Sequence, residues 1–420
     1  MVGAATFLWG FVLFMPVGMN YLGAGLTLLA LASAGGKRVR VLRLRASPLR
    51  WPLLAFAAWA LLVLALGPHY EETGLSAWHD FRIWITLAIT VVLSPDESLA
   101  AIRGFLAGAL LALVAILLVR STGLPDLAIW HHVTVMKGNK SINDALLFTL
   151  VGASAAVLGL ARFGGGRVDW IRVAAAFAVT IAAMWLAAFA LPSRTSLVGL
   201  VVAILGASLH QWRGHLRALL LASGVALALA CAVAWTTPSI RQSFELGLHE
   251  LQEARAGAVS EGSWVVRFHM YRQTAAMMLD RPLAGWGLGS WTPEWHRRGP
   301  PLLADYSMPH NDFLWFGAET GVPGFLILCW LLLSAIRIAW RRRDLAGRLA
   351  FSAALLLAVA TSLNSAMRDA AIGLSLPWIV FVYLRLAEAP GRPWAALARR
   401  RGGSATGAPA PAIGAVRAGQ

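Results

Sequence analysis

The stretch His310–Ile336, HNDFLWFGAETGVPGFLILCWLLLSAI, joins a short polar segment directly to a long apolar run. A membrane-spanning helix needs about 20 consecutive apolar residues, and the run that follows Asp312 is long enough for one. Glu319 and Thr320 make the beginning of this run polar, and Gly321, Pro323 and Gly324 can bend a helix or let a neighbouring helix approach closely. The stretch therefore predicts a membrane span with a polar, kinked start.

The rest of the chain repeats this apolar pattern. Of its 420 residues 58% are hydrophobic and 13% are charged, whereas soluble domains average about 25% charged residues. We therefore predict an all-α polytopic membrane protein with about 12 transmembrane helices. The expected spans are 4–19, 20–35, 51–67, 81–95, 103–120, 143–161, 173–191, 195–211, 217–236, 313–336, 349–366 and 370–387. The first two are short and break at Pro16 and Gly18, so eleven spans are the alternative.

Lysine and arginine alternate in density from loop to loop. Most of the 36 basic residues fall in one set of loops and in the C-terminal tail. An excess of this kind marks the cytoplasmic side, so both termini are expected there. The net charge of +16 is then a sign of topology, and we do not expect the protein to bind nucleic acid.

Four segments follow from this pattern. Residues 1–236 hold nine spans, 237–312 form a long outer loop, 313–387 hold three more spans, and 388–420 form a basic tail that we expect to be disordered. Residues 68–80 are expected to form a shorter outer loop. Within the long loop, the stretches around 240–251 and 264–279 predict two helices, which we expect to cap a cavity at the outer face.

Three arginines are candidate binding residues. Arg194 lies in LPSRTS between two spans, and a charge at membrane depth usually faces a polar cavity or a partner; the alternative is an arginine that reaches the lipid headgroups. Arg267 and Arg272 lie on the second loop helix. Residues five positions apart on a helix project about 140° from each other, so we do not expect these two to share a target.

His310 is a candidate general base. A histidine titrates near neutrality, and a helix N-terminus disfavours its charged form, which leaves a neutral ring that can accept a proton. The alternative is an interfacial His–Asn pair that only caps the helix, since Asn311 is a good helix-start residue.

Glu319 either faces the same cavity or marks a water-exposed helix start. No Walker motif and no zinc-type spacing occurs. No pair of acidic residues stands in an outer loop at the DxD-like spacing that holds a sugar diphosphate through a metal, so arginines would have to neutralise any bound diphosphate.

Three motifs resemble those of a known family and follow the family's order along the chain, with the Ser–Arg–Thr segment first, the arginine-rich segment second and the His–Asn segment last. HNDFLWFGAETGVPG fits the pattern His–Asn, nine residues, Gly–x–x–Gly; PSRTSLVGL is similar to a Ser–Arg–Thr segment that opens a span; and VVRFHMYRQTAAMMLDRPLAGWGLG is similar to an arginine-rich segment that ends in Pro–x–x–Gly–x–Gly. Together they resemble the bacterial O-antigen ligases of the O-antigen ligase/polymerase family. The resemblance covers about residues 190–330.

The resemblance implies a GT-C-like membrane fold and a specific reaction. Such enzymes transfer a glycan from undecaprenyl diphosphate to lipid A–core oligosaccharide at the periplasmic face of the inner membrane, without metal, nucleotide or other cofactor; we expect a monomer. By this resemblance Arg194 and Arg267 bind the donor diphosphate and His310 is the base. The resemblance and position in the chain give further support candidates, namely Asn311, Arg272, Glu319, Gly321, Gly324, Arg368 and Asp369.

Other functions stay open. An O-antigen polymerase would use the same donor with a second lipid-linked glycan as the acceptor, although the His–Asn–x9–Gly–x–x–Gly match favours a ligase. A protein-glycosylating oligosaccharyltransferase usually has a longer C-terminal soluble region than this chain. A transporter of lipid-linked oligosaccharides also fits about twelve spans, but it would need charges near the midplane and on both sides, whereas the candidates gather on one face.

Overall fold

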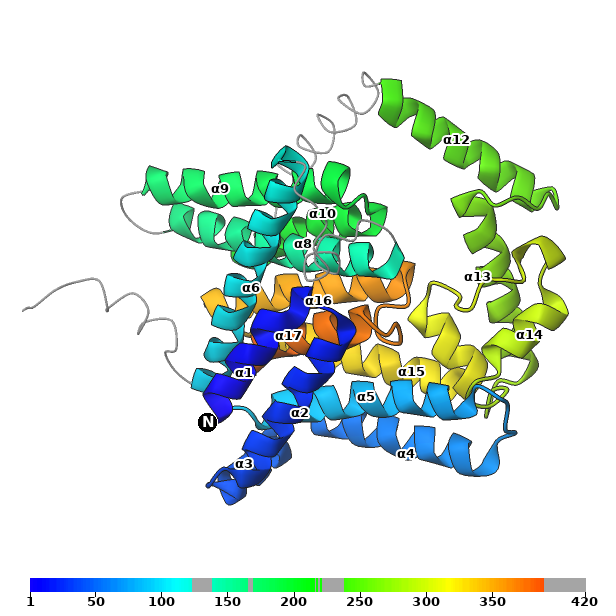
Figure 1. Ribbon diagram of the computed structural model, residues 1–420, viewed down its shortest axis with the longest axis horizontal. Coiled ribbons are helices and arrows are strands. Elements are labelled where there is room, and N and C mark those ends of the chain that lie inside the picture. The colour runs from blue at the N-terminus through cyan, green and yellow to red at the C-terminus, as the bar shows by residue number, and fades with distance from the viewer. Residues whose placement is uncertain (123–137, 165–168, 216, 218–219, 221–237, 389–420) are drawn as a thin grey trace, which may run out of the picture.

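The computed structural model describes residues 1–122, 138–164, 169–215, 217, 220 and 238–388. Within these ranges every regular element is a helix (Figure 1). The helices are α1 (Val2–Phe11), α2 (Val17–Ser33), α3 (Lys37–Ala46), α4 (Arg50–Leu66), α5 (Thr73–Val92), α6 (Pro95–Thr122), α8 (Gly138–Leu160), α9 (Trp170–Trp185), α10 (Arg194–Gln211), α12 (Pro238–Arg255), α13 (Ser263–Asp280), α14 (Trp291–Arg298), α15 (Asp312–Arg341), α16 (Leu345–Leu363) and α17 (Ile372–Glu388).

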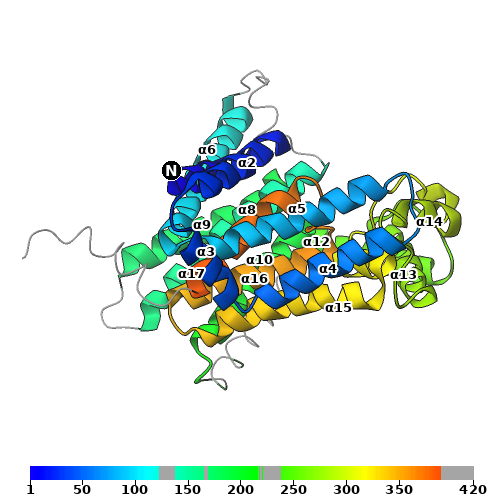
Figure 2. The ribbon, with the colours of Figure 1, turned by 90° about the horizontal axis from the view of Figure 1, so that it is seen from below.

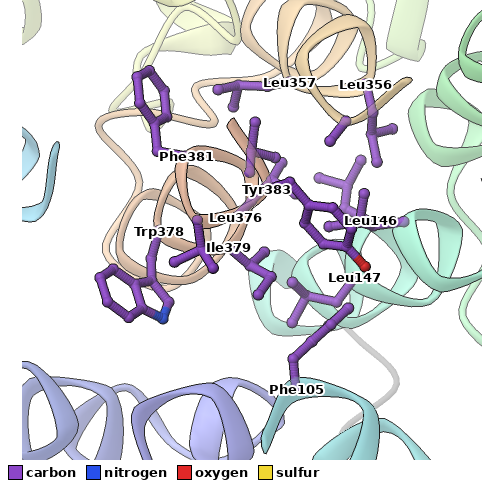
Figure 3. Close-up of a cluster of buried hydrophobic side chains, with 14 of the residues drawn as sticks. Phe105, Leu146, Leu147, Leu356, Leu357, Leu376, Trp378, Ile379, Phe381 and Tyr383 are labelled. Atoms are coloured by element: carbon purple, nitrogen blue, oxygen red, sulfur yellow. The ribbon is translucent and has the colours of Figure 1, made fainter. Parts of the chain in front are cut away.

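Helix α17 is the centre of the bundle. All of its residues from Ile372 to Ala387 are buried, as expected for a helix that is apolar all round. It packs against α5, α6, α8, α15 and α16. Figure 3 shows side chains of α17 among those of α6, α8 and α16, and on another face Trp378 stacks on Trp9 with 3.7 Å between ring centroids. The last helix in the described chain thus holds the first helices in place.

The loops gather at two ends of the bundle. At one end, Ser47 donates to Glu388 at 2.7 Å, Arg385 to the carbonyl of Leu93 at 2.7 Å, and Arg348 to Gln211 at 2.9 Å. This is the end where the arginine-rich loops lie, and we call it the basic end. At the other end, α13 and α14 lie against the first half of α15, and Figures 1 and 2 both place them beyond the rest of the bundle. We call this the loop end.

The fold is that of a polytopic membrane protein. Among the described helices six are long and apolar enough to cross a membrane, namely α6, α8, α9 with its π-helical end, α10, α15 and α16; a seventh is reached if α2 and α3, bent by 115°, count as one span. Eleven of the expected spans overlap a described helix, and the break expected at Pro16 separates α1 from α2. The expected span 217–236 and the tail 388–420 lie almost entirely outside the described residues. The count of twelve stays a prediction.

The structure corrects one expected loop and adds two helices. Residues 73–80, expected in an outer loop, form the first two turns of α5. Asp80 and Arg82 make this stretch look polar, but both side chains are buried in the bundle. Helix α3 was not expected within its basic loop, nor was α14 within the long loop. Both loop helices that were expected are present as α12 and α13.

Candidate active site

His310 precedes α15 in a conformation that is unusual for a side chain with a Cβ. Its φ is 54°, and it is the only residue other than glycine with positive φ in the described chain. Such a backbone stores strain and persists only where its surroundings hold it. The hydroxyl of Tyr271 donates to the His310 carbonyl at 3.0 Å. Asn311 then caps α15, because its side chain accepts from the Leu314 amide at 3.1 Å and donates to the Ser362 carbonyl at 3.0 Å.

The surroundings of His310 keep its ring neutral. The residue is half-buried. Burial and the positive charge of Arg267 lower the pKa of His310 to about 4, since both disfavour the charged imidazolium. At neutral pH the ring is therefore unprotonated and can accept a proton.

A cavity of about 540 Å³ lies between α10, α12, α13 and the end of α16. Arg194, Arg267 and Arg272 line it, together with Tyr271 and apolar side chains such as Leu251 and Leu363. The cavity thus gathers three guanidinium groups from two distant segments of the chain. Arg267 and Arg272 were not expected to share a target, because they leave the helix in different directions. The structure differs from this expectation, since both long side chains reach the same cavity.

Local structure fixes the positions of Arg194 and Arg267. Arg194 is the first residue of α10, directly after Ser193, whose hydroxyl accepts from the Ser196 amide at 3.2 Å. Its side chain is exposed. Arg267 donates through Nη1 to the Ser263 hydroxyl at 2.8 Å, and its Nε is buried without a hydrogen-bond partner among the described residues. A buried donor of this kind favours an anionic ligand.

Comparison with known proteins supports a family assignment. A sequence model of the O-antigen ligase family matches residues 179–329, the segment that holds Arg194, Arg267, His310 and the start of α15. Over this segment the chain is similar to the O-antigen ligase family, which supports the resemblance to the O-antigen ligase/polymerase family. No curated protein gives a significant match to the sequence.

Glu319, inside the matched segment, and Arg368, outside it, lie away from the cavity. They form an ion pair at 2.7 Å, and Asp80 lies 3.3 Å from the same guanidinium. All three side chains are buried. Glu319 was expected either to face the arginine cavity or to mark a water-exposed helix start. The structure shows neither arrangement. A buried ion pair with several hydrogen bonds joins α5, α15 and the turn before α17 instead.

The carboxylates around this turn have structural partners. Asp369 accepts from the amides of Ala371 at 2.9 Å and Ile372 at 2.8 Å, which caps α17. Asp312 accepts from the Met367 amide at 2.7 Å. Since Asp312 follows Asn311 directly, this hydrogen bond ties the start of α15, next to His310, to the turn that carries Arg368.

The two glycines of the His–Asn–x9–Gly–x–x–Gly pattern shape α15 and its neighbours. Gly321 has φ 76° and interrupts the helix. A Cβ on it would lie 2.5 Å from the carbonyl oxygen of Leu283. Across this break the loop after α13 forms backbone hydrogen bonds with α15, from Trp286 to Ala318 at 2.9 Å, Gly287 to Glu319 at 2.9 Å and Val322 to Pro282 at 2.7 Å. Gly324 faces Thr320, where a Cβ would collide with the hydroxyl.

Some residues of the site were missed in the sequence. Tyr271 carries a signal, because it lies one helical turn after Arg267 and so shares its face. Asp80 and Arg82 are two charges within a stretch that continues as an apolar run; Arg82 donates to the carbonyls of Arg368 and Asp369 at 3.0 and 2.8 Å. In the described part of the chain no group of three His, Cys, Asp or Glu side chains is placed to hold a metal ion.

Proposed function

We propose that this protein transfers O-antigen from undecaprenyl diphosphate to lipid A–core oligosaccharide at the periplasmic face of the bacterial inner membrane. The proposal depends chiefly on one observation: a cavity lined by three arginines and by Tyr271, whose hydroxyl donates to the His310 carbonyl, lies next to a half-buried histidine whose pKa is lowered by burial and by Arg267. The match of residues 179–329 to the O-antigen ligase family model supports an O-antigen ligase or polymerase activity. The reaction proposed here is the ligase reaction.

The arginines stabilise the leaving group. When the bond between the glycan and the diphosphate breaks, negative charge develops on the diphosphate oxygen. Guanidinium groups bind phosphate oxygens in pairs and stay charged at every relevant pH. Arg194, Arg267 and Arg272 can therefore stabilise undecaprenyl diphosphate as it departs, and the donor needs neither nucleotide nor metal to be activated.

His310 activates the acceptor hydroxyl. A sugar hydroxyl is a weak nucleophile, and a positioned base accelerates its attack by about 10²–10⁴-fold. The neutral ring of His310 accepts the hydroxyl proton while the acceptor oxygen forms a bond to the anomeric carbon and the bond to the diphosphate breaks. One displacement of this kind inverts the anomeric centre.

The products of the reaction test the proposal. Purified protein would receive undecaprenyl-diphosphate-linked O-antigen and lipid A–core, with EDTA and without nucleotide. Lipid A–core capped with O-antigen, in the anomeric configuration opposite to that of the donor, is the expected product. A lengthened lipid-linked glycan would identify a polymerase instead, and retained configuration would exclude a single displacement.

A transporter is the alternative from another functional class. The candidate arginines and His310 lie together at the loop end of the bundle, whereas a transport path would need charged groups along its length. Movement of labelled lipid-linked oligosaccharide across proteoliposomes, without any glycan transfer, is the result that would favour transport.

A further inference from the structure

A second, larger cavity lies at the basic end of the bundle. Its volume is about 610 Å³, and Arg43, Arg341, Arg342 and Arg385 line it with Ser47 and Glu388. These residues come from α3, the turn before α4, the end of α15 and the end of α17. The cavity is at the opposite end of α15 from His310, so it is separate from the proposed transfer site.

The charges around this cavity do not balance. Arg385 pairs with Glu388 at 3.0 Å, and Arg342 pairs with Asp344 at 2.7 Å. Arg43 approaches Arg385 closely enough for the two positive charges to repel. The acidic residue near Arg43, Glu97, is already bound by Arg40 at 2.6 Å. Arg341 has no carboxylate partner among the described residues. Two guanidinium groups thus face the cavity without a carboxylate of their own.

The cavity lies at one end of a candidate membrane span, where lipid headgroups are expected. It lies beside the last turns of the span α15, where Ile338, Pro48 and Ala387 make part of its wall apolar. Helix α3 adjoins it and turns by 115° from α2. This helix carries five basic residues, and its Val39 and Leu42 are exposed. A short basic helix with exposed apolar side chains is typical of a segment that lies in the headgroup region.

We propose that this cavity binds the phosphate group of an anionic phospholipid. Arg43 and Arg341 supply the charge that the protein leaves unmatched, Arg342 and Arg385 complete the ring of donors, and the apolar wall adjoins the acyl chains. Basic pockets between membrane helices are suited to such headgroups, because each arginine near the surface attracts anionic lipid. The site does not depend on the proposed glycan transfer.

Lipid binding to the full chain tests this site. Protein in detergent would be titrated with phosphatidylglycerol, phosphatidylcholine or inorganic phosphate, and bound lipid counted by native mass spectrometry. We expect phosphatidylglycerol to bind most tightly. The double variant Arg43→Gln/Arg341→Gln should lose about 30-fold in affinity, since each arginine contributes attraction of order 1 kcal/mol. Arg343→Gln is the matched control, because Arg343 is exposed beside Arg342 but does not line the cavity.

The single variant Arg341→Gln guards against a folding defect. Arg341 is exposed, so its replacement should leave the melting temperature without lipid unchanged while it weakens phosphatidylglycerol binding several-fold. Equal affinity in Arg341→Gln, the double variant and Arg343→Gln would overturn the proposal. Displacement of the lipid by millimolar inorganic phosphate would overturn it as well, because the site would then take a soluble anion.

Discussion

At the residue scale, His310 combines a strained backbone with a ring held neutral. Its φ of 54° places it apart from every other described residue that has a side chain, and Tyr271 and Asn311 tie the backbone on both sides to α13 and α16. Strain at one residue is unusual unless its position is needed. The sequence motif indicated the residue, but it did not indicate the conformation, which depends on contacts with segments about 40 and 50 positions away.

The pH dependence of transfer follows from this environment. An ordinary histidine has a pKa of about 6.5, whereas burial and Arg267 lower the pKa of His310 to about 4. A depressed pKa keeps the base unprotonated as pH falls, so kcat/KM should stay level from about pH 8 down to about pH 5 and decline only near the lowered pKa. Initial rates across this range measure it. A decline centred near the ordinary histidine value contradicts the buried, neutral base.

Two variants of Arg267 separate the effect of its positive charge from the effect of its guanidinium shape. Arg267→Gln removes both, so kcat should fall by about 10²–10³-fold, and the acid limb of the pH profile should move to higher pH because a positive charge beside His310 is gone. Arg267→Lys should also lower kcat, since the two-pronged contact to phosphate is lost, but it should leave the acid limb in place. Arg255→Gln, an exposed arginine on α12, is the control. Equal pH profiles for all three variants would contradict the coupling of Arg267 to His310.

At the element scale, most helices could be predicted and their contacts could not. Long apolar runs marked the spans because a helix must satisfy its own backbone in lipid. Helix α5 began earlier than predicted, since Asp80 and Arg82 are buried against partners from the turn before α17. A hydropathy scale scores such residues as polar even when their charges are paired inside the bundle. For the same reason it could not show that Glu319 and Arg368 form a pair.

Gly321 is the residue on which the shape of α15 depends. Gly321→Ala should destabilise the protein by about 1–3 kcal/mol, because alanine at φ 76° is strained and its Cβ would press on the Leu283 carbonyl. Thermal unfolding in detergent would show this as a lower melting temperature. Gly74→Ala is the matched control, since a Cβ there meets nothing within 4 Å and lies within α5; it should be neutral or slightly stabilising. Equal melting temperatures for the two variants would mean that the break in α15 tolerates a side chain.

At the scale of the whole molecule, the two ends of the bundle have different chemistry. The loop end gathers the arginine cavity and His310, and the basic end gathers the arginine-rich loops. Alternation of basic residues along the sequence predicted this division, because loops on one side of a membrane share their charge. The convergence of Arg194, Arg267 and Arg272 on one cavity could not be predicted, since it depends on how α10 and α13 pack in three dimensions.

Cysteine labelling tests the orientation in the membrane. In a background with Cys231→Ala and Cys329→Ala, Glu261→Cys at the loop end should react with an impermeant maleimide in cells whose outer membrane alone is permeable. Arg343→Cys at the basic end should react only after the inner membrane is opened. Both positions are exposed, so accessibility reports side and not burial. The reverse pattern would place His310 on the cytoplasmic side and exclude periplasmic transfer.

The most direct measurement is the rate of glycan transfer by His310→Asn against His249→Ala. Asparagine tolerates positive φ better than most residues but cannot act as the base, and His249 is an exposed histidine of the same long loop. With saturating donor and lipid A–core, His310→Asn should keep its melting temperature and lose about 10²–10⁴-fold in rate, while His249→Ala should transfer like the unchanged protein. A folded His310→Asn variant with full activity would contradict the assignment of His310 as the base.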